Sequence, residues 1–276
     1  MSKNVRENLV WYIGGLLILL YALAPVAWIV SLSFKEGADI TNKQFWPTDW
    51  GWSNYQAAFD SGLFIPALRN SLGISIIATM LAVLLATFAA YGIARLDFPG
   101  KTVILSTALA VAIFPVISIV TPLFNLWRQI GLFDTWLGLI IPYMALTLPI
   151  SIWVLSAFFR EIPWEMEQAA QVDGATTWQA FRKVIVPVAW PGVATTAIIA
   201  FFIAWNDFVF GISLTSTERA RPVPAALSSF TGASQFEEPT GAISAAAMIV
   251  TIPVIVLVLF FQRQIVAGLT NGAVKG

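Results

Sequence analysis

The chain has 276 residues, of which 58% are hydrophobic and only 11% are charged, and its mean hydropathy is +0.79. Soluble domains carry about 25% charged residues, and a domain of this size could not bury so much apolar surface, so the composition indicates a membrane protein. Lys and Arg balance Asp and Glu at 15 each, which leaves no excess of basic residues for nucleic acid. The absence of Cys and His excludes disulfides, thiolate or imidazole catalysis, and the usual zinc and haem ligands.

Six segments without Asp, Glu, Lys or Arg are each long enough to cross a bilayer, since a helix of about 20 apolar residues spans the hydrocarbon core. In chain order these windows are residues 9–34, 71–94, 102–127, 135–159, 184–206 and 239–262. None has the short alternating pattern of a membrane barrel strand. We therefore expect an all-α, polytopic membrane protein with six transmembrane helices.

The distribution of positive charge predicts which side each loop faces. Lys and Arg are denser in residues 1–8, 95–101, 160–183 and 263–276 than in the remaining loops, and such residues favour the cytoplasmic side. Both termini are therefore expected in the cytoplasm. The outer loop after the first window carries Trp46, Trp50, Trp52 and Tyr55, which suit either an interfacial aromatic belt or a small folded cap.

The expected organisation has three parts. Residues 1–66 hold the first helix and the outer loop, residues 67–262 form a core of five helices, and residues 263–276 form a cytoplasmic tail. Eight prolines inside the windows predict kinks, either static or acting as hinges. They are Pro25, Pro115, Pro122, Pro142, Pro149, Pro187, Pro191 and Pro253.

Tyr is the only ionisable side chain inside the windows, whose polar groups are otherwise hydroxyls and amides. Proton-coupled transporters and voltage sensors usually bury charged side chains, so their absence here disfavours those classes. Hydroxyls and amides suit a neutral solute such as a sugar, although they also join helices to one another. For Asn125 and Asn206, whose amides cost more to bury, the two interpretations are equally weighted.

No segment has the pattern of a nucleotide site. The string Phe98–Thr102 ends like a phosphate-binding loop, but Arg95 stands where the first glycine is required, and no strand precedes it. If ATP drives this protein, a partner chain must therefore bind the ATP and its Mg²⁺. No cofactor or metal is expected on this chain.

Residues 160–191 form the most informative cytoplasmic loop. Pro163 suits a first helical turn, with Glu165 and Glu167 near its positive end, and Gly174 suits the position just after that helix. Thr176 and Gln179 have the spacing of a capping box for a second helix. Such an elbow can dock in a groove of another protein or lie on the bilayer, and the residues alone do not decide between these.

The loop resembles the EAA motif of bacterial ABC importer permeases. Ala169, Ala170 and Gly174 occupy motif positions, as do Val184, Val186 and Pro187, whereas Gln168 replaces the motif glutamate. The string Ala204-Trp205-Asn206-Asp207 and the tail from residue 262 to Gly276 resemble the carbohydrate branch, in particular six-helix permeases of the maltose-importer type. More narrowly, residues 234–241 are similar to trehalose-importer permeases of actinobacteria.

The resemblance implies a type I importer fold and partners: a dimeric cytoplasmic ATPase, a second permease that is more often a different chain, and an extracytoplasmic sugar-binding lipoprotein. It implies an ATPase-coupling site built from Glu165, Glu167, Gln168, Ala169, Ala170, Asp173, Gly174, Pro187, Lys275 and Gly276. A pathway for sugar is expected at Trp205 and Asn206, where an indole can stack and an amide can bond, and at Asn125; packing is the alternative role.

The sequence thus predicts a non-enzymatic permease subunit, in the cell membrane, for ATP-driven import of a di- or oligosaccharide such as trehalose or a maltose-like sugar. The main alternative is an ATP-independent facilitator or channel. A membrane-embedded enzyme using Glu165, Glu167 and Asp173 ranks lowest, because no base or metal ligand accompanies these carboxylates. The sequence does not identify the sugar, nor whether the partner permease is a second copy of this chain.

Overall fold

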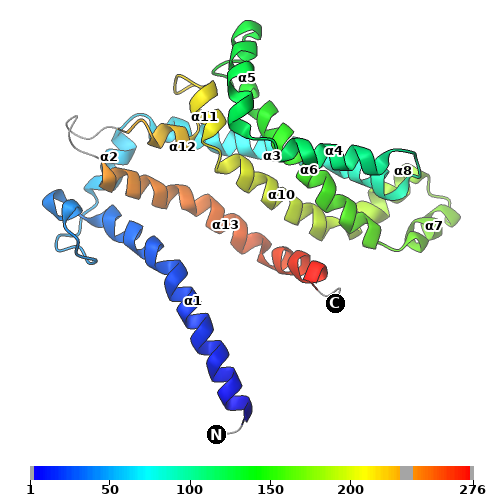
Figure 1. Ribbon diagram of the computed structural model, residues 1–276, viewed down its shortest axis with the longest axis horizontal. Coiled ribbons are helices and arrows are strands. Elements are labelled where there is room, and N and C mark those ends of the chain that lie inside the picture. The colour runs from blue at the N-terminus through cyan, green and yellow to red at the C-terminus, as the bar shows by residue number, and fades with distance from the viewer. Residues whose placement is uncertain (1–2, 231–238, 274–276) are drawn as a thin grey trace. The chain divides into compact units, whose positions relative to one another are not determined.

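The computed structural model describes residues 3–230 and 239–273, and within them it is built from helices (Figure 1). In these residues the one extended pairing is an isolated bridge between Lys35 and Trp50. The prediction of an all-α protein is confirmed. The elements are α1 (Lys3–Phe34), η1 (Gly37–Thr41), α2 (Ser53–Asp60), α3 (Phe64–Arg95), α4 (Lys101–Ala112), α5 (Val116–Ile130), α6 (Trp136–Glu161), α7 (Trp164–Val172), α8 (Thr177–Ala180), the π-helical η2 (Phe181–Ile185), α9 (Val186–Val188), α10 (Trp190–Trp205), α11 (Val209–Leu214), α12 (Val223–Leu227) and α13 (Thr240–Ala273).

Among the described residues, four helices are long enough and apolar enough to cross a membrane: Trp11–Phe34 of α1, α3, α6 and Thr240–Gln262 of α13. Two further spans are broken. Helices α4 and α5 meet at 87°, and the helical segment Thr177–Val188 meets α10 at 71°. Counting each bent pair as one span gives the six predicted spans.

Prolines lie at both breaks. Pro115 precedes α5 in an extended conformation, and Pro191 occupies the first turn of α10, where its missing N–H is tolerated. The other interior prolines, such as Pro142 and Pro149, lie within helices that continue through them. The sequence therefore predicted kinks at eight prolines but did not distinguish the prolines at the two breaks from those inside continuing helices.

The chain divides into two compact units, one formed by Met1–Ile65 with Leu227–Ile252 and the other by Pro66–Ala226 with Pro253–Gly276. In the first unit the outer loop folds onto the end of α1. The ring of Phe34 packs against those of Trp50, Trp52 and Tyr55 at 5.1–5.7 Å between centroids. This packing agrees with a small folded cap.

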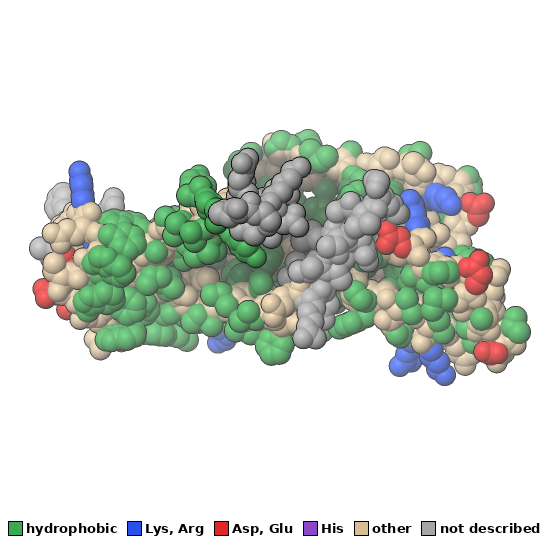
Figure 2. Space-filling model, turned by 90° about the horizontal axis from the view of Figure 1, so that it is seen from below, with side chains coloured by type: hydrophobic (Ala, Val, Ile, Leu, Met, Phe, Trp, Pro, Cys, Tyr) green, Lys and Arg blue, Asp and Glu red, His purple; other side chains and the backbone are tan. Residues whose placement is uncertain are grey.

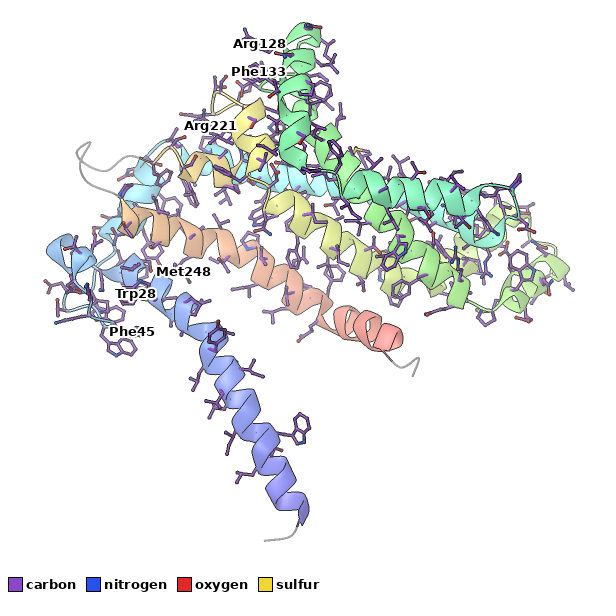
Figure 3. The ribbon with its side chains drawn as sticks, viewed as in Figure 1. Trp28, Phe45, Arg128, Phe133, Arg221 and Met248 are labelled. Atoms are coloured by element: carbon purple, nitrogen blue, oxygen red, sulfur yellow. The ribbon has the colours of Figure 1, made fainter. Side chains whose placement is uncertain are left out.

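Lys35 is completely buried in this cap. Its ammonium group donates to the Gln44 carbonyl at 2.6 Å and the Asn42 side chain at 3.0 Å, and it lies 4.9 Å from the Trp28 ring centre. Trp28 also packs on Phe45, with ring centroids 5.9 Å apart; both residues are labelled in Figure 3. A buried charge is tolerated only with such partners, so Lys35 organises the loop around itself.

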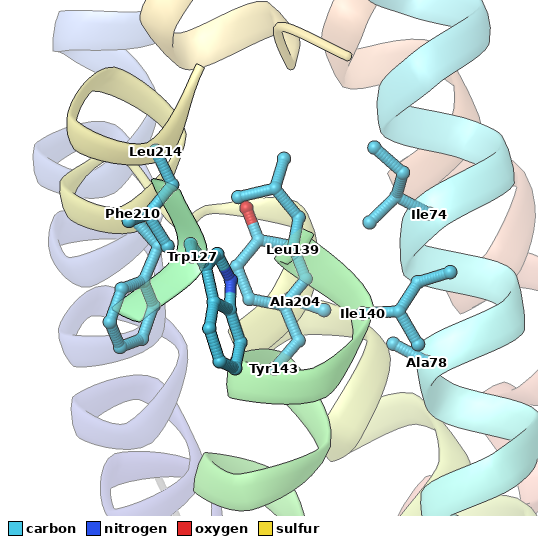
Figure 4. Close-up of a cluster of buried hydrophobic side chains, with 9 residues drawn as sticks. All are labelled: Ile74, Ala78, Trp127, Leu139, Ile140, Tyr143, Ala204, Phe210 and Leu214. Atoms are coloured by element: carbon cyan, nitrogen blue, oxygen red, sulfur yellow. The ribbon is translucent and has the colours of Figure 1, made fainter. Parts of the chain in front are cut away.

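In the second unit α6 packs against both α4 and α10. Figure 4 shows one of the two hydrophobic clusters of this unit. In it Ile74 of α3, Trp127 of α5, Tyr143 of α6 and Phe210 of α11 come together. A second cluster joins α3 and α6 to residues of the 160–191 loop. It includes Ala86, Ala90, Leu155, Phe159, Phe181 and Ile185.

Asn70 fixes the connection between α11 and α12. Its fully buried side chain donates to the carbonyls of Glu218 and Arg221 at 2.8 and 3.1 Å and accepts from the Trp136 indole at 3.0 Å. The neighbouring Ser71 hydroxyl accepts from the Val223 amide at 2.7 Å. The start of α3 therefore holds the segment that follows the fifth span.

Candidate functional site

The candidate site is the elbow formed by α7, α8 and η2. The first helix starts after Pro163, which is its N-cap, and carries Glu165 and Glu167 in its first turn. Figure 2 shows that on the visible face acidic and basic side chains gather around the end that carries α7 and α8. The elbow is thus a charged structure joined directly to apolar helices.

Gly174 closes α7 as the sequence predicted. Its φ is +86°, its amide donates to the Gln171 carbonyl at 3.0 Å, and the Ala175 amide donates to the Ala170 carbonyl at 2.9 Å. This pair of hydrogen bonds is the Schellman motif, in which glycine adopts the left-handed conformation without steric cost. The turn therefore satisfies the last carbonyls of α7 within itself.

The predicted capping box is also present. The Thr176 amide donates to the Gln179 side chain at 2.8 Å, and the Gln179 amide donates to the Thr176 hydroxyl at 3.3 Å. The second helix begins at Thr177 and passes into the π-helical turn Phe181–Ile185 before the 71° bend into α10. The elbow is therefore continuous with the fifth span.

Glu167 is not on the surface of the elbow. Its Oε1 accepts a 2.5 Å hydrogen bond from the Tyr91 hydroxyl, and its Oε2 lies 3.6 Å from Nε of Arg95. Arg95 in turn donates to the Ile162 carbonyl at 2.9 Å and lies 4.9 Å from the Trp164 ring centre. We call this group of five residues the latch, since it ties α7 to the end of α3.

The latch excludes water from its charges. The side chains of Arg95 and Glu167 are 6% and 4% exposed, so each charge depends on the other. Breaking a buried ion pair leaves an uncompensated charge and typically costs about 3–5 kcal/mol. Within the elbow, Glu167 is an internal anchor, and its burial argues against direct contact with another protein.

Unlike Glu167, the other predicted coupling residues that the structure describes are exposed or half-buried. Glu165, Gln168, Ala169, Asp173 and Gly174 are exposed, Ala170 is half-buried, and Pro187 is exposed beyond η2. Glu165, Gln168, Ala169 and Val172 share one face of α7 by their spacing, and Val172 is 87% exposed. This face presents small and apolar side chains beside acidic ones. Lys275 and Gly276 lie outside the described residues.

The predicted sugar-pathway residues differ in their exposure to solvent. Trp205 is only 4% exposed and stacks on Phe201 at 5.3 Å, so its indole face is not open to a sugar. Asn206 is exposed and donates to the Phe202 carbonyl of its own helix at 2.9 Å. Asn125 is exposed on α5.

Asp207 is a residue of interest that sequence reasoning did not select. Its carboxylate accepts from the Tyr143 hydroxyl and the Gly211 amide, both at 3.0 Å, and so caps the start of α11. Burial raises the pKa of Asp207 above its usual range, although hydrogen bonds from Gly211 and Tyr143 oppose the shift. An Asp three residues before Phe210 has the spacing of a helix cap, a signal that was available in the sequence.

In the described residues no group of three or more His, Cys, Asp or Glu side chains is placed to hold a metal ion. The elbow and the latch consist of side-chain and backbone contacts within one chain. Their arrangement offers a surface for another protein, joined mechanically to two membrane helices.

Comparison with known families gives a match over most of the chain. Residues 82–271 match the model described as the binding-protein-dependent transport system inner membrane component. The matched region contains the whole elbow, the latch and α10.

Two named relatives align along their full length. The chain is 55% identical over 273 residues to the trehalose transport system permease protein SugB of Mycobacterium tuberculosis, covering 99% of this chain and 100% of the relative. It is 34% identical over 278 residues to the trehalose/maltose transport system permease protein MalG of Thermococcus litoralis, covering 100% of both.

Solved structures support the fold. A chain of a bacterial ABC transporter that imports the acidic polysaccharide alginate superposes with a TM-score of 0.78 at 23% identity, covering 95% of this chain and 98% of that one. A second structure, the alginate transporter in complex with an alginate-pentasaccharide-bound periplasmic protein, gives 0.67 at 21% identity, covering 94% of both chains.

Proposed function

This chain belongs to the family of binding-protein-dependent transport system inner membrane components, and on that basis we propose that it is the permease subunit of an ATP-driven importer for a di- or oligosaccharide. The identity of 55% to a trehalose transport permease favours trehalose as the sugar, with a maltose-like disaccharide as the next candidate. Membership in a family of transport components favours import over the enzymatic alternative.

The observation that carries the proposal is the exposed face of α7. Glu165, Gln168, Ala169 and Val172 lie on a short helix whose far side is held to α3 by the latch. Small side chains allow close approach of a partner backbone, and Val172 offers apolar area to bury. An ATPase docked here transmits its movement through η2 to α10, because the elbow and the fifth span are continuous.

The importer needs three further components. A cytoplasmic ATPase dimer binds ATP and Mg²⁺, since this sequence has no phosphate-binding loop. A second permease, expected to be a different chain, completes the pathway, and an extracytoplasmic binding protein delivers the sugar. The solved alginate transporter complex, which contains a periplasmic protein with its saccharide, supports the binding-protein component by analogy.

Within the pathway Asn206 is the strongest candidate for sugar contact, because its amide is exposed at the end of the fifth span. Asn125 is a second candidate on α5. The tail residues Lys275 and Gly276 are proposed to approach the ATPase, as the family resemblance implies.

The first test is copurification followed by reconstitution. The tagged chain, extracted in mild detergent, should carry stoichiometric ATPase and a second permease, and proteoliposomes supplied with the binding protein should take up trehalose only with ATP. Sugar flux at the same rate without the ATPase or ATP would instead support the facilitator alternative.

A matched pair of variants localises the docking face. Ala169→Trp adds bulk on the exposed face of α7 and should reduce ATPase copurification strongly. Ala57→Trp makes the same change on the exposed surface of α2, on the predicted opposite side of the membrane, and should leave copurification unchanged. Equal ATPase recovery from both variants would contradict docking at α7.

A further inference from the structure

A groove of about 620 Å³ runs between α3 and the segment from α8 to α10, within the second unit of the chain. Met80, Leu84 and Phe88 form its wall on α3, and Val193 and Ala197 form its wall on α10. Two threonines are in the lining: the Thr87 hydroxyl is bonded to the Val83 carbonyl of its own helix at 2.7 Å, and among the described residues the buried Thr79 hydroxyl has no hydrogen-bond partner. The surface of the α3–α10 groove is therefore almost wholly apolar.

One end of the α3–α10 groove is polar and aromatic. Arg182 lines it together with Trp178, which is 56% exposed. Trp178 also stacks on Phe88 with ring centroids 6.1 Å apart. Tryptophan and arginine at one end of an apolar surface are typical of the boundary between hydrocarbon and headgroups.

The charge of Arg182 is available to a ligand. Among the side chains that the structure describes, no carboxylate lies within ion-pair distance of its guanidinium group. By contrast, Arg95, about two helical turns beyond the groove on α3, is committed to Glu167 in the latch.

The dimensions of the groove correspond to one leaflet. Its wall from Thr79 to Phe88 rises about 13 Å along α3, roughly half of a 30 Å hydrocarbon core. A transmembrane helix from another chain is about 10 Å across and runs through both leaflets, so a half-length groove that ends at a cation fits an amphiphile better.

We propose that the α3–α10 groove binds one anionic glycerophospholipid, with an acyl chain along α3 and the phosphate at Arg182. Basic side chains between membrane helices recognise anionic headgroups in this way, and a planar guanidinium can donate two hydrogen bonds to one phosphate. Since η2 and the bend into α10 form part of the wall, the lipid contacts the connection through which the elbow reaches the membrane.

The test is lipid retention measured by native mass spectrometry on the full chain in detergent, supplied with equal phosphatidylglycerol and phosphatidylcholine. The wild type should retain one phosphatidylglycerol. Arg182→Gln should lower its retention about tenfold and leave phosphatidylcholine unchanged, whereas Arg182→Lys should retain part of the preference. Lys183→Gln is the matched control, because Lys183 carries the same charge one residue away and does not line the groove.

Two further variants separate the lipid from other occupants. Ala197→Trp fills the apolar part of the groove and should reduce retention of both lipids. Because the chain has no native cysteine, a single Leu84→Cys variant can carry a photocrosslinker within the assembled importer, and it should label phospholipid. Crosslinking to another protein chain, equal losses from Arg182→Gln and Lys183→Gln, or no lipid on the wild type would each overturn the proposal.

Discussion

The Tyr91 hydroxyl and the Glu167 carboxylate, 76 residues apart in sequence, are joined by a 2.5 Å hydrogen bond that fastens the elbow to the end of α3. Arg95 lies on the same helix one turn later and supplies the opposite charge. The elbow is thus held from inside, and its exposed face is left for a partner.

Glu167→Gln should weaken this attachment. The amide can still accept from Tyr91, but Arg95 loses its counter-charge in a buried site, which should cost about 3 kcal/mol of unfolding free energy. The measurement is thermal unfolding of the purified chain in detergent. Tyr91→Phe removes only a hydrogen bond and should cost about 1–2 kcal/mol.

Glu165→Gln serves as the control for the latch, because Glu165 is exposed on the opposite side of α7. It should leave the unfolding temperature unchanged and affect only coupling to the ATPase. If Glu167→Gln proved as stable as Glu165→Gln, the latch would not anchor the elbow.

Gly174→Ala should be tolerated with a small loss of unfolding free energy. No atom lies within 4 Å of a Cβ added there, so the cost is the left-handed conformation alone, about 1–2 kcal/mol. Gly174→Pro cannot adopt φ +86° and loses the amide that bonds Gln171, so it should abolish sugar uptake while the chain still inserts in the membrane.

The matched control for Gly174 is Gly92→Ala on α3, which has equal space around its Cβ and a helical backbone. It should leave uptake unchanged and raise the unfolding free energy by about 0.5–1 kcal/mol, because alanine favours a helical backbone over glycine. Normal uptake with normal ATPase stimulation in Gly174→Pro would show that the elbow angle is not needed for coupling.

Asn206→Leu tests the proposed sugar pathway. The hydrogen bond of Asn206 goes to Phe202 on its own helix, so its loss should cost less than about 0.6 kcal/mol, and the interhelical role considered from the sequence has no bond to support it here. Transport should fall while sugar-independent ATPase activity persists in the reconstituted complex. Unchanged transport would remove Asn206 from the pathway.

Asp207 should make stability depend on pH. Because burial raises its pKa in the fold, the folded chain holds this proton more tightly than the unfolded chain does, so stability falls as pH rises from the ordinary value of 3.8 through the raised value. Asp207→Asn should flatten this dependence in unfolding scans across that range. Tyr143→Phe removes a hydrogen bond that stabilises the Asp207 carboxylate. It should therefore raise the pKa of Asp207 further and shift the loss of stability to higher pH.

The sequence was sufficient for the helices and the corner of the elbow, because these depend on local rules. The helices follow from continuous uncharged windows. The corner follows from Gly174 and from the Thr176–Gln179 spacing, which each determine the conformation of a few neighbouring residues. The angles of the broken spans were not predictable, since Pro115 permits a bend but the packing of α5 on α11 sets its direction.

The roles of Glu167 and Trp205 were beyond local reasoning for the same reason. From the sequence alone, Glu167 is expected to be a solvated carboxylate near the start of a helix. Only the fold shows that it contacts Tyr91 and Arg95. The sequence suggests an aromatic side chain open at a membrane boundary for Trp205, whereas tertiary packing leaves this side chain only 4% exposed. Both outcomes depend on distant or tertiary contacts that a single sequence does not display.

The π-helical turn Phe181–Ile185 is the segment of the elbow that is expected to deform most readily. The corner at Gly174 closes its own hydrogen bonds, while between Phe181 and Ile185 the ladder shifts to longer i→i+5 bonds, such as that from the Val186 amide to the Phe181 carbonyl. The elbow therefore has a rigid turn at Gly174 and a more deformable segment at Phe181–Ile185, so a force on α7 should bend the second before the first. Strain applied at α7 is therefore expected to be absorbed at 181–185 and released as rotation of α10 about its 71° bend.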